Sequence, residues 1–197
     1  MTTRPIPLRA TDAIGDPELV ARALDGDRWS REVIYRRHAP SLLGMTIRLL
    51  ANRDEAEEIV QDTFVTGFTQ LATLREAAAL RAWLGQIAVR LVHARVRRRR
   101  FLRALGLDRG ADDATLAALS APDMPADQRT DLALLDEVLA GLRAPIRIAW
   151  MLRRVEGLEL TEVASMTGCS LATVKRRIAE AEAVVRKHVD VVEEVES

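Results

Sequence analysis

Residues 158–178 constrain the fold most, because apolar residues with helical spacing stand on both sides of a single glycine. Gly168 suits a left-handed residue that ends one helix, and Ser170 is a good N-cap for the next. The apolar faces of the two helices are expected to consist of Leu160, Val163, Ala164 and Met166, and of Leu171, Val174 and Ile178. The segment is therefore predicted to be a helix-turn-helix, which places the start of its second helix in the major groove of DNA.

The second of these helices leaves a basic cluster outside its apolar face. Short side chains at its start let the backbone approach base edges, and the basic side chains that follow can reach phosphates or guanine. The residues expected to contact DNA are Ser170, Ala172, Thr173, Lys175, Arg176 and Arg177. The alternative is a helical hairpin with a solvated run of charges, but glycine, cap and basic cluster coincide here, which favours DNA binding.

The composition predicts an all-α protein. Hydrophobic residues make up 48% of the 197 residues and aromatic residues only 4%, so the cores are built from leucine, valine, isoleucine and alanine, which favours helices. No strand-like alternation of useful length is found. Cys169 is the one cysteine, so no internal disulfide can form, which fits a reducing cytoplasm.

The helical patterns form two groups. Between them the sequence is rich in aspartate, proline and glycine and has no long apolar stripe, which is typical of a linker. We therefore expect two small helical domains joined by a linker, the second of them containing the helix-turn-helix. The predicted units are a tail at 1–16, a domain at 17–103, an acidic linker at 104–130, a domain at 131–190 and an acidic tail at 191–197.

The first group contains an acidic helix and an arginine-rich helix. The acidic helix has a clean apolar stripe over 56–71, and its other face is either solvated or a docking surface for a partner helix. In the arginine-rich helix, the four consecutive arginines at 97–100 repel one another unless an anion such as phosphate compensates them. The alternative for this run is a solubilising helix end that the helix dipole favours.

Both groups resemble one family, the extracytoplasmic-function sigma factors of bacterial RNA polymerase. RDEAEEIVQDTFVTGF (53–68) is similar to the family's helix that docks on core polymerase, and WLGQIAVRLVHARVRRRR (83–100) to its promoter-melting helix. LAGLRAPIRIAWMLRRVEGLELTEVASMTGCSLATVKRRI (139–178) resembles its domain that binds the minus-35 element. The family usually has basic residues where this chain has Glu180 and Glu182.

The resemblance implies a sigma subunit that binds core polymerase, directs it to promoter DNA and helps to open the duplex. The implied core-polymerase contacts are Asp54, Glu55, Glu58, Gln61 and Asp62. Residues 73–79 correspond to a loop that captures an unstacked minus-10 base. The residues implied for minus-10 binding and melting are Thr73, Arg75, Arg81, Trp83, Arg90, Arg95, Arg97 and Arg98. An anti-sigma factor as a partner is implied by the family alone.

Other classes of protein fit less well. A stand-alone helix-turn-helix regulator that binds duplex DNA without polymerase is the main alternative. An enzyme is not expected, because His38, His93 and His188 lie far apart and no phosphate loop or metal-ligand spacing occurs, so no metal or cofactor is predicted. No segment approaches the length of a membrane span and no signal peptide is found, so a cytoplasmic location is expected.

Overall fold

The computed structural model describes residues 14–105, 134, 135 and 137–195. Those residues contain helices and no strand, which confirms the predicted all-α fold. The elements are α1 (Asp16–Leu24), α2 (Arg28–Leu50), α3 (Arg53–Gln70), η2 (Leu71–Thr73), η3 (Ala77–Ala79), α4 (Leu80–Ala104), α6 (Ala144–Arg154), α7 (Leu160–Thr167) and α8 (Leu171–Val195). The predicted linker lies outside the described residues except for its first two positions.

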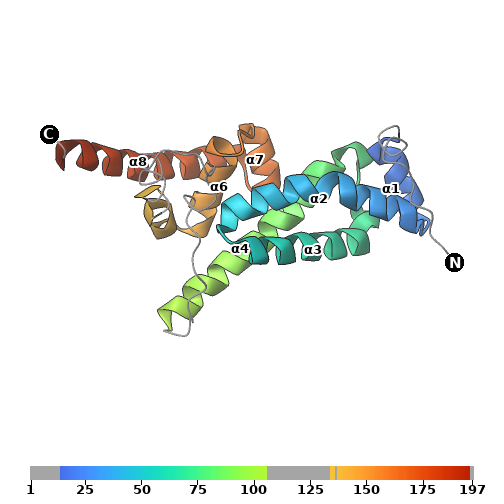
Figure 1. Ribbon diagram of the computed structural model, residues 1–197. Coiled ribbons are helices and arrows are strands. Elements are labelled where there is room, and N and C mark those ends of the chain that lie inside the picture. The colour runs from blue at the N-terminus through green and yellow to red at the C-terminus, as the bar shows by residue number, and fades with distance from the viewer. Residues whose placement is uncertain (1–13, 106–133, 136, 196–197) are drawn as a thin grey trace, which may run out of the picture.

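Helices α1 to α4 pack together as one unit, with α2, α3 and α4 side by side (Figure 1). The predicted stripe of α3 is buried at Ile59, Val60 and Phe64, against a core that includes Leu84 and Val92 of α4. A local contact fixes the start of α3. The Asn52 side chain accepts a hydrogen bond of 2.9 Å from the Glu55 N–H, which caps α3.

Gly67 brings α3 and α4 unusually close together. A Cβ atom at this position would lie 2.9 Å from Leu84 Cδ2, which is shorter than side chains tolerate. The backbone of α3 therefore approaches α4 at a place where no larger residue fits without movement of the core.

Helices α6, α7 and α8 form the second unit. Its core includes Ile148, Met151, Leu152, Val163 and Val174. One prediction is wrong here, because Leu171, expected to be buried, is 40% exposed. Leu171 is the first residue of α8 and stands outside the core that Val174 and Ile178 of the same helix join.

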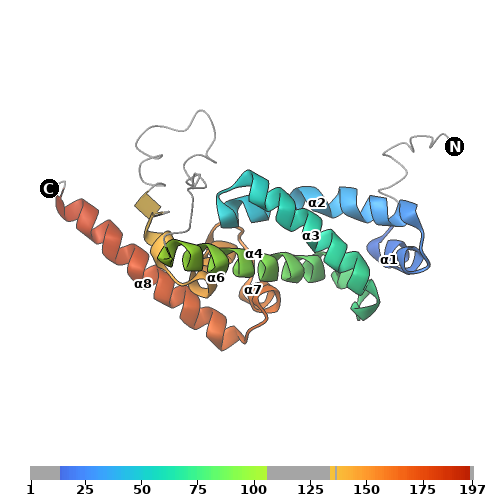
Figure 2. The same cartoon turned by 90° about the horizontal axis from the view of Figure 1, so that it is seen from below.

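The two units also contact each other directly, through α7 on α4 (Figure 2). A Cβ on Gly85 of α4 would lie 2.6 Å from Met166 Cε of α7, so a larger residue at position 85 would displace the end of the Met166 side chain. Gln86 Nε2 donates a hydrogen bond of 2.9 Å to Ser165 Oγ. The second unit thus covers one face of α4, a contact that the sequence did not indicate.

An ion pair joins the units beside this contact. Arg48 of α2 donates from Nε and Nη2 to the two carboxylate oxygens of Glu156, the second bond being 2.7 Å long. The Glu156 side chain is only 13% exposed. A two-pronged pair of this kind is stronger than a single contact, because both carboxylate oxygens are occupied in a fixed geometry.

Candidate nucleic-acid interface

The turn between α7 and α8 has the geometry that the sequence predicts. Gly168 has a φ of +63°, in the left-handed region, and the Cys169 N–H donates to the Ala164 carbonyl over 3.2 Å. Ser170 Oγ accepts a hydrogen bond of 3.2 Å from the Thr173 N–H, so Ser170 caps α8. These bonds fix where α8 begins and therefore which side chains its first turns present.

The basic residues that follow face away from the core of the second unit. Lys175 and Arg176 are exposed, while Arg177 is half-buried with Nη1 3.4 Å from Cys169 Sγ. None of the three pairs with a carboxylate in the part of the chain that the structure describes. Ala172 is exposed and small, so a base edge or phosphate can approach this helix start closely.

The outer face of α3 is acidic and open. Asp54, Gln61 and Asp62 are exposed and have no side-chain partner among the described residues. Val65 lies one turn beyond Gln61 and is 67% exposed. Gln61 and Asp62 lie within one turn of Val65, so the outer face of α3 presents polar side chains and one apolar side chain to solvent.

Glu55 and Glu58, the other two residues of the predicted acidic set, form ion pairs within the protein. Arg95 of α4 pairs with Glu58 at 2.9 Å and with Glu55 at 3.5 Å, and Arg99 also pairs with Glu55 at 3.5 Å. The Glu55 side chain is 18% exposed. These pairs hold α4 against α3, so Arg95 points to a carboxylate within the protein.

The residues predicted for the minus-10 element lie in two groups along α4. Thr73 and Arg75 are exposed beside its start, together with Arg81 and the half-buried Trp83. The exposed arginines Arg90, Arg97 and Arg98 lie further along. At 1.5 Å per residue, Arg81 and Arg97 are about 24 Å apart along the helix axis.

The second group borders the contact between the two units. Arg90 and Arg97 line a hollow of about 330 Å³ whose other wall includes Arg143 and Pro145 at the start of α6. His93 lies in the same wall of α4. Burial lowers the pKa of His93 below 6.5, and the positive charges of Arg177 and Arg97 lower it further. This side of α4 is therefore crowded with cations that come from both units.

Comparisons with known proteins match both units. The model of Sigma-70 region 2 matches residues 34–101, and that of Sigma-70, region 4 matches residues 132–183. The ferric citrate uptake sigma factor FecI of Escherichia coli is 31% identical over 158 residues, which cover 76% of this chain and 85% of that protein. The RNA polymerase sigma-H factor of Pseudomonas aeruginosa is 26% identical over 181 residues, 87% of this chain and 92% of that protein.

The chain belongs to the extracytoplasmic-function sigma factors. It is a sigma subunit that associates with core RNA polymerase and acts in promoter recognition at transcription initiation, rather than a regulator that binds DNA alone. The family consists of non-enzymatic initiation factors. None of the described helices has the length and hydropathy needed to cross a membrane.

Solved structures of sigma factors share the fold. CnrH, in complex with the cytosolic domain of CnrY, superposes with a TM-score of 0.60 at 24% identity, over 89% of this chain and 97% of that one. The sigma factor RpoE of Bartonella quintana, in complex with the anti-sigma factor NepR, gives a TM-score of 0.58 at 25% identity, over 77% and 91% of the two chains.

Glu180 and Glu182, where the resemblance leads one to expect basic residues, have separate partners. Glu182 accepts a hydrogen bond of 2.9 Å from Arg154 Nε, which ties α8 to α6. Glu180 lies 3.6 Å from Arg143 Nη2. Of the two, Glu182 therefore serves to pack the helices together, whereas Glu180 faces Arg143, which is exposed and has no local sequence signature.

Proposed function

We propose that this sigma factor uses the start of α8 for the minus-35 element and the outer face of α3 for core polymerase. Residues 73–79 and the exposed arginines of α4 would bind the minus-10 element and help to open the duplex. The observation that carries the proposal is the start of α8, where Lys175 and Arg176 lie exposed, without carboxylate partners among the described residues, directly after a capped turn.

Of the arginines predicted to contact the minus-10 element, Arg95 is not proposed to bind DNA. Arg95 is occupied by Glu55 and Glu58, so it supports α4 instead of reaching DNA. The remaining arginines at 81, 90, 97 and 98 are exposed and can meet phosphates of a strand that runs along α4.

Binding to a promoter requires the two units to separate. In the structure α7 and the start of α6 lie on the side of α4 that carries Arg90 and Arg97. Two promoter elements that are separated along a duplex cannot both be met by helices packed against each other. The segment 104–130 reaches about 85 Å when extended, which permits the separation on core polymerase.

The proposal also covers the domain bounds: the functional units are 17–103 and 131–190, with a linker between them and short tails outside. The protein would act in the cytoplasm, where its polymerase is. RpoE of Bartonella quintana, a structural neighbour, is bound to an anti-sigma factor, which supports an anti-sigma partner for this chain as well.

A charge reversal on α3 tests the proposal. Asp62→Arg is expected to abolish transcription with purified core polymerase, because it places a cation at the centre of the proposed docking face, beside Val65. The control is Asp25→Arg, which makes the same charge change at an exposed position after α1. Normal transcription by the Asp62 variant would refute the assignment of this face.

A further inference from the structure

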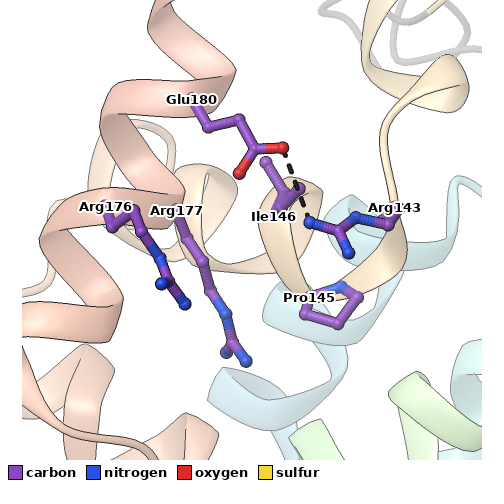
Figure 3. A pocket seen from close by; sticks show the side chains of 6 residues that line it. All are labelled: Arg143, Pro145, Ile146, Arg176, Arg177 and Glu180. Atoms are coloured by element: carbon purple, nitrogen blue, oxygen red, sulfur yellow. Dashed lines mark ion pairs between the residues drawn. The ribbon is translucent and has the colours of Figure 1, made fainter.

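A hollow beside α8, the proposed reading helix, is lined by Arg143, the residue before α6, and by Arg176 and Arg177 of α8 (Figure 3). It has a volume of about 390 Å³ and lies between the start of α6 and the first turns of α8. Its lining residues are Arg143, Pro145, Ile146, Arg176, Arg177 and Glu180. Arg143 stands on one side of the hollow, and Arg176 and Arg177 stand on the other.

The charges around the hollow do not balance. Glu180 is the one carboxylate in its lining, 3.6 Å from Arg143. Both side chains of this pair are largely exposed, at 76% for Arg143 and 46% for Glu180, so the attraction is weakened by solvent. Arg176 and Arg177 pair with no carboxylate among the described residues. The hollow is thus left with two uncompensated positive charges and one cation held only weakly.

We propose that this hollow binds one backbone phosphate of the minus-35 duplex, and that Glu180 holds Arg143 until the phosphate replaces it. A guanidinium presents a planar fork of donors that matches a phosphate group, and three arginines line this hollow, of which Arg177 also lies 3.4 Å from Cys169 Sγ. The inference rests on the proposed contact between α8 and the minus-35 element. It adds Arg143, from outside the reading helix, as a DNA contact, and it gives Glu180 a role.

The placement of the hollow favours a phosphate over a base. The start of α8 enters a groove that is about 12 Å wide and bordered by two phosphate strands. The start of α6 lies beside α8, so Arg143 comes to the groove's border and not to its floor. Contacts of this kind set the register and orientation of a protein on DNA and carry no sequence information themselves.

The inference is tested by the affinity of the holoenzyme for promoters that the wild-type holoenzyme selects from a duplex library. Arg143→Gln should weaken binding roughly tenfold, equally on all selected promoters, because it removes one charge-assisted contact. It should also lower the salt slope of binding by about 0.9. Glu180→Gln should tighten binding several-fold, since Arg143 is then free for phosphate. The double variant should behave like Arg143→Gln alone, because the effect of Glu180 acts through Arg143.

Matched controls separate a local effect from a general change of charge. Glu137→Gln removes the same charge from an exposed position of the second unit that does not line the hollow, and it should leave the affinity close to that of wild type. Arg186→Gln does the same for an exposed arginine further along α8. Unchanged thermal melting of each variant shows that the second unit is folded.

Other outcomes would overturn the inference. If Lys175→Ala weakens binding while Arg143→Gln changes neither affinity nor salt slope, the reading helix binds DNA but the hollow holds no phosphate. If Arg143→Gln alters the selected sequence, the arginine contacts a base. If it weakens assembly with core polymerase, the hollow meets an acidic protein segment. A wild-type holoenzyme that selects no promoter would contradict the proposed function itself.

Discussion

Helices α4 and α8 are both 25 residues long and both carry arginines, yet the structure uses their charges differently. In α4, Arg95 and Arg99 pair with carboxylates of α3, and the second unit lies over part of the helix. In α8, Lys175 and Arg176 stand in solvent at the helix start. An arginine-rich sequence therefore does not by itself mark a nucleic-acid surface, since the packing around each helix decides which charges remain open.

The largest effect is expected from removing the exposed cations at the start of α8. The double substitution Lys175→Ala and Arg176→Ala should reduce promoter binding by the holoenzyme about 100-fold, because it removes two contacts worth about 1–3 kcal/mol each. Both side chains are exposed, so the melting temperature of the protein should not change. Wild-type promoter binding by this variant would show that the start of α8 does not read DNA.

Removing an ion pair between α4 and α3 is expected to lower the stability of the protein. Arg95→Ala should lower the free energy of unfolding by about 1–3 kcal/mol, because it removes a partner from the Glu55 carboxylate, which is mostly buried. Arg98→Ala, at an exposed position of the same helix, should change it by less than about 0.5 kcal/mol. Urea unfolding measures both values, and equal values would mean that the pairs with α3 contribute nothing.

A smaller effect is expected where the second unit covers α4. Arg48→Ala removes the partner of Glu156 and should cost the contact between the units about 1 kcal/mol. Hydrogen exchange should then speed up around Gly85 and Gln86, and small-angle scattering should show a larger radius of gyration. Arg36→Ala breaks an exposed pair within α2 and serves as the control. Identical exchange in the two variants would argue against a coupling of the units through Arg48.

The smallest effect concerns pH and again contrasts two places in the fold. Burial lowers the pKa of His93 at the contact between the units, and burial also lowers the pKa of His38 within the first unit, against the opposing effect of Asp16. In each case the folded state releases its proton more readily than the unfolded state, whose pKa is about 6.5. The stability that neutral histidine contributes is thus complete above pH 6.5 and decreases as the pH falls below it.

The substitutions that test this are His93→Gln and His38→Gln. Each should flatten part of the decrease in unfolding free energy between about pH 7.5 and 5.5, measured by urea titration at both values. The change at His93 should also reduce the tendency of the units to separate in acid, because Arg97 and Arg177 then face no additional charge. If both variants keep the slope of the wild type, neither histidine contributes.

Much of the second unit could be read from its sequence. The left-handed Gly168, the cap at Ser170 and the buried Val163, Val174 and Ile178 all follow from local rules about turns, caps and helical spacing. The error at Leu171 has a local cause, since the helical period indicates which side of a helix a residue is on but not whether a neighbour extends far enough to cover it.

The pairing of charges could not be read in this way. Glu55 and Glu58 were grouped with Asp62 on one acidic face, whereas the structure turns them toward Arg95 of another helix. Val65 and Arg143 were overlooked because a single exposed valine or arginine has no local signature. Their significance comes from their neighbours in space.

The sequence by itself determined the helices, the turn of the helix-turn-helix and the family, because these depend on residues close together in the chain or on motifs matched in order. The tertiary structure alone decided which cations are open and that α7 rests on α4. Arg95 meets a glutamate 37 residues away, and Arg48 meets one 108 residues away. Such meetings follow from how whole helices pack, since the side-chain period of a helix fixes directions only within that helix.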